Sequence, residues 1–128
     1  MPSKTRKNSK RGSIVPVFLS MLNTVKLYHW KTSSYSTHKA TDELYTQLNE
    51  KIDSFVEIML GTTPRALVLH PISLRTPLFK NNDDFKRQVE KYKGYLMGMT
   101  SSLGPDLINI RDEILGVLNQ FLYLLTLH

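Results

Sequence analysis

The 128-residue chain contains no cysteine, which excludes disulfide bonds, thiol catalysis and metal sites built on cysteine ligands. It also lacks an apolar run of the roughly 18 residues that a membrane span requires. The N-terminal segment carries charges, but neither an apolar run nor a small-residue cleavage site follows directly. We therefore expect a cytoplasmic protein that is neither secreted nor membrane-bound.

Acidic residues are missing from the first 13 positions, although the whole chain has a formal net charge of +6. Five cations account for most of this charge, because the remaining residues are nearly neutral. They are Lys4, Arg6, Lys7, Lys10 and Arg11. Such a block is typical of a disordered tail that binds a polyanion. Residues 1–13 are predicted to bind DNA, with a segment that only aids solubility as the alternative.

Alternating segments rich in Val, Ile and Thr, which would indicate strands, are also missing. Instead, apolar residues recur at steps of three and four, the period of an amphipathic helix. This pattern predicts four helices, at about 14–30, 36–60, 84–103 and 106–125. Approximately 115 residues in four such helices are enough for one domain with its own core.

Polar residues, glycine and proline predict the ends of these helices. Ser13 is expected to cap the first helix, and Gly61 to follow the last residue of the second. One of the residues 82–84 is expected to cap the third helix, which Gly104 and Pro105 should end.

Three prolines, Pro64, Pro71 and Pro77, make a long helix improbable in the segment 62–80. A connection of this length between compact helices indicates that the chain crosses from one end of the molecule to the other. The second and third helices would then be parallel. The prediction is an all-α, ferritin-like four-helix bundle over residues 14–128, with one long crossover between helices two and three.

Residues with metal-binding side chains gather on one side of the second predicted helix. At 100° per residue, His38, Asp42, Asp53 and Glu57 fall within an arc of about 100° beside the apolar stripe. His29 lies in line with the apolar residues of the first helix. Imidazole and carboxylate ligands suit iron, manganese or zinc. The alternatives are a core histidine at position 29 and an ordinary acidic helix edge.

The Glu-x-x-His pair of many ferritin-like proteins is absent, which argues against a di-iron site within one subunit. The chain instead resembles the Dps family, the DNA-binding proteins from starved cells or mini-ferritins. The resemblance covers residues 18–61 well and the last two helices only in length and pattern. It rests on Tyr28-His29-Trp30, on His38 followed by Asp42, on Asp53 followed by Glu57, and on Leu60-Gly61.

The resemblance implies a hollow shell of twelve identical subunits in which iron is oxidised and stored. Ferrous iron would bind across a two-fold interface, to His29 and His38 of one chain and to Asp53 and Glu57 of its neighbour. Asp42 would help to hold a second iron ion. Hydrogen peroxide would oxidise Fe²⁺ to Fe³⁺, a ferroxidase-type activity that protects against oxidative stress.

The chain also departs from the family pattern. Trp30, which would lie near the iron, is followed by Thr32-Ser33-Ser34 where the family has a glycine. The interval between His29 and His38 is shorter than in the family, which would displace His29 from the site. The chain is short as well, as in virus- or phage-encoded members, which would place it in the host cytoplasm or the virion. The alternative function is a structural or DNA-compacting bundle, for instance of a virion, that has lost iron oxidation.

Overall fold

The structure is a computed structural model that describes residues 13–67, 69–77 and 79–127. Within these residues the secondary structure consists of four α-helices and two short 3₁₀ turns, without strands. The elements are α2 (Ile14–Lys31), α3 (Tyr35–Thr62), η1 (Pro64–Ala66), α4 (Asn82–Met97), η2 (Thr100–Ser102) and α5 (Pro105–Leu125). The prediction of four helices is confirmed. The predicted basic tail lies outside the described residues, except for Ser13.

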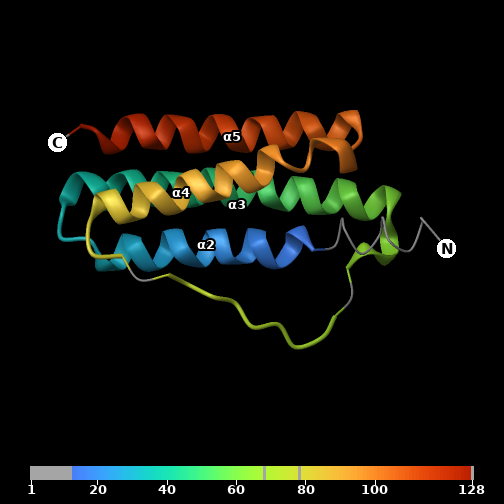
Figure 1. The fold of residues 1–128 in the computed structure, drawn as a ribbon, viewed down its shortest axis with the longest axis horizontal. Coiled ribbons are helices and arrows are strands. Elements are labelled where there is room, and N and C mark those ends of the chain that lie inside the picture. The colour runs from blue at the N-terminus through green and yellow to red at the C-terminus, as the bar shows by residue number, and fades with distance from the viewer. Residues whose placement is uncertain (1–12, 68, 78, 128) are drawn as a thin grey trace.

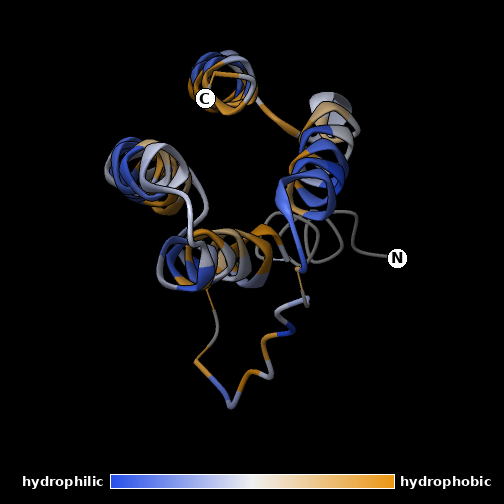
Figure 2. Cartoon of the chain, turned by 90° about the vertical axis from the view of Figure 1, so that its left-hand side faces the viewer, coloured by the Kyte–Doolittle hydropathy of each residue, from blue (hydrophilic) through white to orange (hydrophobic). Residues whose placement is uncertain are grey.

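The four helices run along the length of one bundle (Figure 1). A short connection joins α2 to α3, which runs in the opposite direction. The described parts of the segment 63–81, called here the α3–α4 connection, return along the bundle, so that α4 runs in the same direction as α3. Viewed from the end of the bundle, α3 lies between α2 and α5 (Figure 2). Helix α4 lies on the side of the bundle opposite α3.

The apolar stripes of the four helices meet in a single core. Phe18 of α2 and Phe55 of α3 are almost completely buried, with an edge-to-face contact of 5.1 Å between ring centroids. Phe85 of α4 makes the same kind of contact with Phe121 of α5. Burial of each such ring contributes about 1.5–3 kcal/mol. The predicted helical period is thus reflected in the core, and on α5 it is Leu118 that is buried, whereas Val117 is only partly buried.

The predicted ends of α2 and α3 are partly correct. Ser13 is the N-cap residue of α2, as predicted, but its side chain makes no capping hydrogen bond. Gly61 lies inside α3 rather than after it, because the helix continues to Thr62 and the N–H of Thr63 donates to the carbonyl of Met59. Pro64 then ends the helical pattern, since proline has no N–H to continue it.

The ends of α4 also differ from the prediction. Asn81, not a residue in 82–84, is the N-cap, and its side-chain oxygen accepts from the N–H of Asp84 at 2.9 Å. The helix ends at Met97 instead of continuing to residue 103. The guanidinium of Arg111 donates to the carbonyl of Leu96 at 2.9 Å, a carbonyl that a continuing helix would use itself.

The described residues include no helix that is both long and apolar enough to cross a membrane.

Candidate metal centre

His29, near the end of α2, and His38, in the first turn of α3, lie face to face. Their ring centroids are 3.8 Å apart and their planes differ by 18°. The Nδ1 atom of each ring lies 2.8 Å from the backbone carbonyl oxygen of the other residue. Because a carbonyl oxygen can only accept, each Nδ1 must carry the hydrogen. In the neutral rings both Nε2 atoms then keep the lone pair that a metal ion needs.

Polar groups of the first turns of α3 hold this pair in place. The hydroxyl of Thr41 is fully buried, donates to the carbonyls of Thr37 and His38, and lies 3.1 Å from Nδ1 of His29. Ser34 caps α3 by accepting from the N–H of Thr37. The short connection therefore brings the two imidazoles together. The sequence pattern did not single out Thr41, because a hydroxyl is not a typical ligand in such sites.

Exposure differs between the two rings, since His29 is buried and His38 is exposed. Trp30 is 67% exposed, and the ammonium group of Lys26 lies 5.8 Å from the centre of its ring. The same ammonium group lies 4.4 Å from the ring centre of Tyr45, on α3. The ammonium group of Lys26 thus links Trp30 of α2 to Tyr45 of α3.

Asp53 and Glu57 lie one turn apart on α3 and are both exposed. A hydrogen bond to Asp53, followed by the charge of Asp53 and a small contribution from burial, raises the pKa of Glu57 above its usual range. Two carboxyl groups so close to each other share a proton more readily than they carry two charges. Such a pair is a dianionic ligand once a cation replaces the proton.

The histidine and carboxyl pairs are far apart within one chain. His38 and Asp53 are 15 positions apart on the same helix, which corresponds to about 22 Å. Asp42 lies one turn from His38 and is exposed. Among the described residues, no three His, Asp or Glu side chains come close enough together to hold a metal ion. The structure thus brings His29 and His38 together, and Asp53 and Glu57 together, but not the two pairs.

Both pairs border the outer face of α2 and α3, called here the α2–α3 face. Helical spacing places one row of α2 side chains on it and one row of α3 side chains. These are Leu19, Asn23, Lys26 and Trp30 on α2, and Tyr35, His38, Lys39, Asp42, Tyr45, Asn49, Asp53 and Glu57 on α3. The end near the α2–α3 connection is aromatic and basic, whereas Asp53 and Glu57 make the other end acidic.

Comparison with known proteins gives a family but no activity. A model described as "Family of unknown function (DUF5856)" matches residues 29–125, more than half of the chain. The chain is also 27% identical, over 93% of each sequence, to a protein of Enterobacteria phage T4. That protein is described as "Uncharacterized 14.6 kDa protein in mobD-ri intergenic region". No solved structure matches.

Proposed function

Because the chain belongs to DUF5856, a family of unknown function, we propose a function from the geometry of the site: a Dps-like protein that oxidises ferrous iron and stores the ferric product. The observation that carries this proposal is the interlocked His29–His38 pair. Backbone carbonyls hold both Nδ1–H groups, so both Nε2 lone pairs remain for a metal ion. The all-helical bundle and its long α3–α4 connection agree with a ferritin-like fold.

The stacking of the rings favours two metal ions over one. An imidazole binds a metal ion in its own ring plane, at about 2.0–2.1 Å from the nitrogen. Two nearly parallel planes separated by a ring distance of 3.8 Å cannot share one ion. Each histidine would therefore bind its own ion, with Asp42 supporting the one at His38.

A second copy of the chain would supply the missing carboxylates. In an antiparallel, two-fold contact between α2–α3 faces, the basic end of one copy meets the acidic end of the other. His29 and His38 of one chain would then approach Asp53 and Glu57 of its partner. This arrangement explains why the potential ligands border the core and why one chain does not assemble them.

Iron is the substrate of the proposed reaction, and hydrogen peroxide is the oxidant. Two ferrous ions each give one electron to one peroxide molecule, whose O–O bond breaks. With two water molecules, the products are two ferric oxyhydroxide units and four protons. The carboxylates suit the hard ferric product and the imidazoles suit the ferrous reactant. Storage of the product calls for a closed shell, for which we propose twelve copies.

DNA association would come from the basic tail. Its five cations are Lys4, Arg6, Lys7, Lys10 and Arg11. Contacts to phosphates would be independent of base sequence and would weaken steeply with salt. A shell that displays many tails would multiply the weak binding of each one.

Peroxide-driven iron oxidation tests the proposed centre. We expect Glu57→Gln and His38→Ala to slow the formation of the ferric product, followed by its absorbance after anaerobic loading with Fe²⁺. Glu90→Gln is the matched control, because Glu90 is an exposed carboxylate on α4, away from the α2–α3 face. Equal rates in all proteins, with intact helicity, would contradict the proposal and favour a structural or DNA-compacting bundle.

A further inference from the structure

The α3–α4 connection projects from the bundle as a loop beyond α2 (Figure 1). The end view shows the same loop, with apolar residues along its projecting part (Figure 2). Its residues 69–77 have no regular secondary structure. Leu69 is 89% exposed, and Leu67 and Ile72 are 36% and 40% exposed. A partner that approaches from this side therefore meets exposed apolar side chains before it meets a helix.

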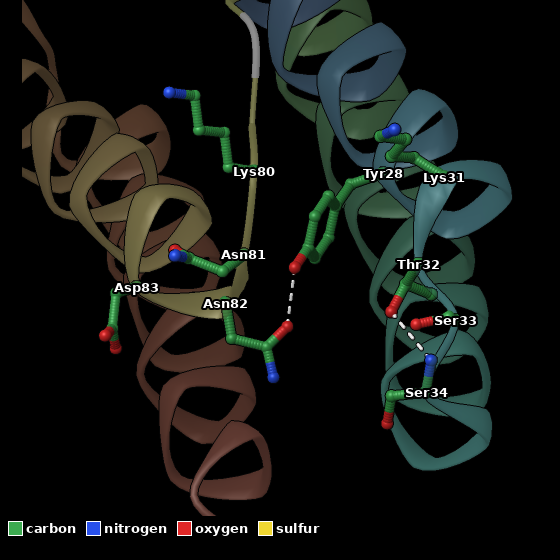
Figure 3. Close-up of a pocket in the computed structure, with 9 residues that line it drawn as sticks. All are labelled: Tyr28, Lys31, Thr32, Ser33, Ser34, Lys80, Asn81, Asn82 and Asp83. Carbon is green, nitrogen blue, oxygen red and sulfur yellow. Dashed lines mark hydrogen bonds between the residues drawn. The ribbon is translucent and has the colours of Figure 1, made fainter.

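Three contacts hold the later part of this loop against the bundle. The hydroxyl of Ser20 donates to the carbonyl of Arg75 at 2.9 Å. The ring of Phe79 meets the ring of Tyr28 edge to face, with centroids 5.6 Å apart. The hydroxyl of Tyr28 in turn donates to the side-chain oxygen of Asn82 at 2.6 Å, between α2 and the start of α4 (Figure 3). The exposed apolar residues precede all three contacts in the sequence, so these contacts hold the loop in place without covering them.

The connection lies along a different side of α2 from the α2–α3 face. It follows the row of α2 side chains that contains Ser20, Leu27 and Lys31. At 100° per residue, this row lies roughly 90° around the helix from the row that contains Leu19 and Lys26. A partner of the connection would therefore leave the α2–α3 face available to a second copy of the chain.

Acidic residues are absent from α2 and from the connection. All 11 Asp and Glu residues of the chain lie on α3, α4 and α5. Within the connection, Arg65 and Arg75 are exposed, and neither takes part in the four ion pairs found among the described residues. The third cation, Lys80, lies beside Asp84, which accepts from its N–H at 2.9 Å, so its charge is partly offset. The two arginines therefore give the projecting loop a positive charge that its own residues do not balance.

We propose that the α3–α4 connection docks on the surface of a bilayer that contains anionic lipids. Arg65 and Arg75 flank Leu69 and Ile72 in the sequence, so cations meet the headgroups where apolar side chains enter the acyl boundary. Nucleic acid is a poorer match, because exposed leucine and isoleucine side chains gain nothing from contacts to phosphates.

The proposed contact is shallow. Backbone without regular secondary structure has N–H and C=O groups that the hydrocarbon core would leave unpaired, so only the side chains of the loop enter the bilayer. Such a contact needs no membrane-spanning helix, but it departs from the sequence-based expectation of a protein that is not membrane-bound. It does not depend on the proposed iron chemistry, because none of the proposed iron ligands lies in the connection.

Co-sedimentation of the full chain with lipid vesicles tests the proposal. One set of vesicles contains phosphatidylcholine alone, and the other contains equal parts of phosphatidylcholine and phosphatidylserine. We expect the chain to sediment with the second set and to remain in solution with the first. Binding to neither set, or equal binding to both, would overturn the proposal. Because the basic tail can itself attract anionic lipids, variants of the connection decide which segment is responsible.

A leucine variant tests the apolar part of the contact. Leu69→Ser should weaken binding to the anionic vesicles about fivefold, because a serine side chain gains little at the acyl boundary. Leu127→Ser is the matched control, since Leu127 is a 49% exposed leucine just beyond α5. Equal affinities in these two variants would overturn the proposal, because the tail alone would then account for the binding.

An arginine variant tests the electrostatic part. Arg65→Gln with Arg75→Gln should weaken binding to the anionic vesicles about tenfold or more. The matched control is Lys86→Gln with Lys91→Gln, which removes two exposed lysines of α4. A loss no larger than in this control would show that only the net charge of the protein matters, and would overturn the proposal.

A fluorescent label distinguishes insertion from a contact between copies. Because the chain has no cysteine, Leu69→Cys gives a single site for an environment-sensitive fluorophore. Its emission should shift to shorter wavelength with anionic vesicles, whereas the same label in Leu127→Cys should not respond. Identical responses at the two positions would overturn the proposal.

Light scattering and iron oxidation complete the test. If Leu69→Ser changed the mass of the assembly but not vesicle binding, the connection would pack against a second copy and the proposal would be overturned. Peroxide-driven iron oxidation should proceed at the same rate in Leu69→Ser as in the unmodified chain. Failure of the membrane contact and failure of the proposed iron activity are therefore distinguishable results.

Discussion

At the scale of single residues, hydrogen bonds decide which atoms are left for chemistry. The two Nδ1–H groups of His29 and His38 are used by backbone carbonyls, so only Nε2 can bind a metal ion. The sequence could predict both histidines, since each lies at a helical position beside the apolar stripe. It could not predict their interlock, which depends on the length and conformation of residues 32–34 and on the buried hydroxyl of Thr41.

The first residue-scale prediction concerns the proton shared by Asp53 and Glu57. The hydrogen bond and the charge of Asp53 raise the pKa of Glu57, so Glu57 keeps its proton to a higher pH than an ordinary glutamate. The contribution of this group to stability is therefore present at low pH and is lost as the pH rises through the raised pKa. Asp53→Asn should lower the pKa of Glu57, because the amide can donate to a charged carboxylate.

Carbon-13 NMR titration of the side-chain carboxyl groups, without metal, measures this effect. Glu50, which is also exposed on α3, is the internal reference in both proteins. An unchanged titration of Glu57 in Asp53→Asn would show that the two carboxyl groups do not interact.

At the scale of secondary-structure elements, apolar spacing predicts the helices better than their ends. The stripes of α3 and α4 are buried as expected, because packing against neighbours requires a continuous apolar row. The end of α4 depends on Arg111, which lies 14 positions beyond Met97 in the sequence and reaches back to the carbonyl of Leu96. Local signals such as Gly104 and Pro105 could not reveal this contact between elements.

The element-scale prediction tests this role of Arg111, which is only 7% exposed. Its guanidinium donates to the carbonyl of Leu96 and to the hydroxyl of Thr100. Arg111→Met keeps much of the volume but removes both of these charge-assisted hydrogen bonds and leaves the carbonyl of Leu96 with backbone donors alone, such as the N–H of Met99, which should lower the free energy of unfolding by about 2 kcal/mol.

Urea unfolding measures the loss, and amide hydrogen exchange should show reduced protection around η2. Arg87→Met serves as the control, because Arg87 is an exposed partner of Asp84, and exposed pairs contribute less than about 1 kcal/mol. A loss in Arg111→Met no larger than in the control would mean that packing alone ends α4.

At the scale of the whole molecule, a single chain does not explain why the α2–α3 face exposes large aromatic side chains. Trp30 and Tyr35 are 67% and 75% exposed, although large aromatic side chains are usually covered. The sequence could predict the bundle, because the core is formed within one chain. It could not predict what covers this face, since helical spacing alone does not distinguish a solvated border from an interface between copies.

The last prediction is that the chain forms a closed assembly through this face. Twelve copies of 14.8 kDa give about 178 kDa, to be measured by light scattering at micromolar concentration. Lys39→Glu should shift the mass toward the 14.8 kDa monomer, because Lys39 lies at the basic end of the α2–α3 face and would meet the acidic end of a partner. Lys91→Glu, on α4, is the matched control and should leave the mass unchanged. A monomer mass for the unmodified chain would contradict both the shell and an iron site shared between copies, because Asp53 and Glu57 of one chain lie about 22 Å and about 28 Å along α3 from its own His38.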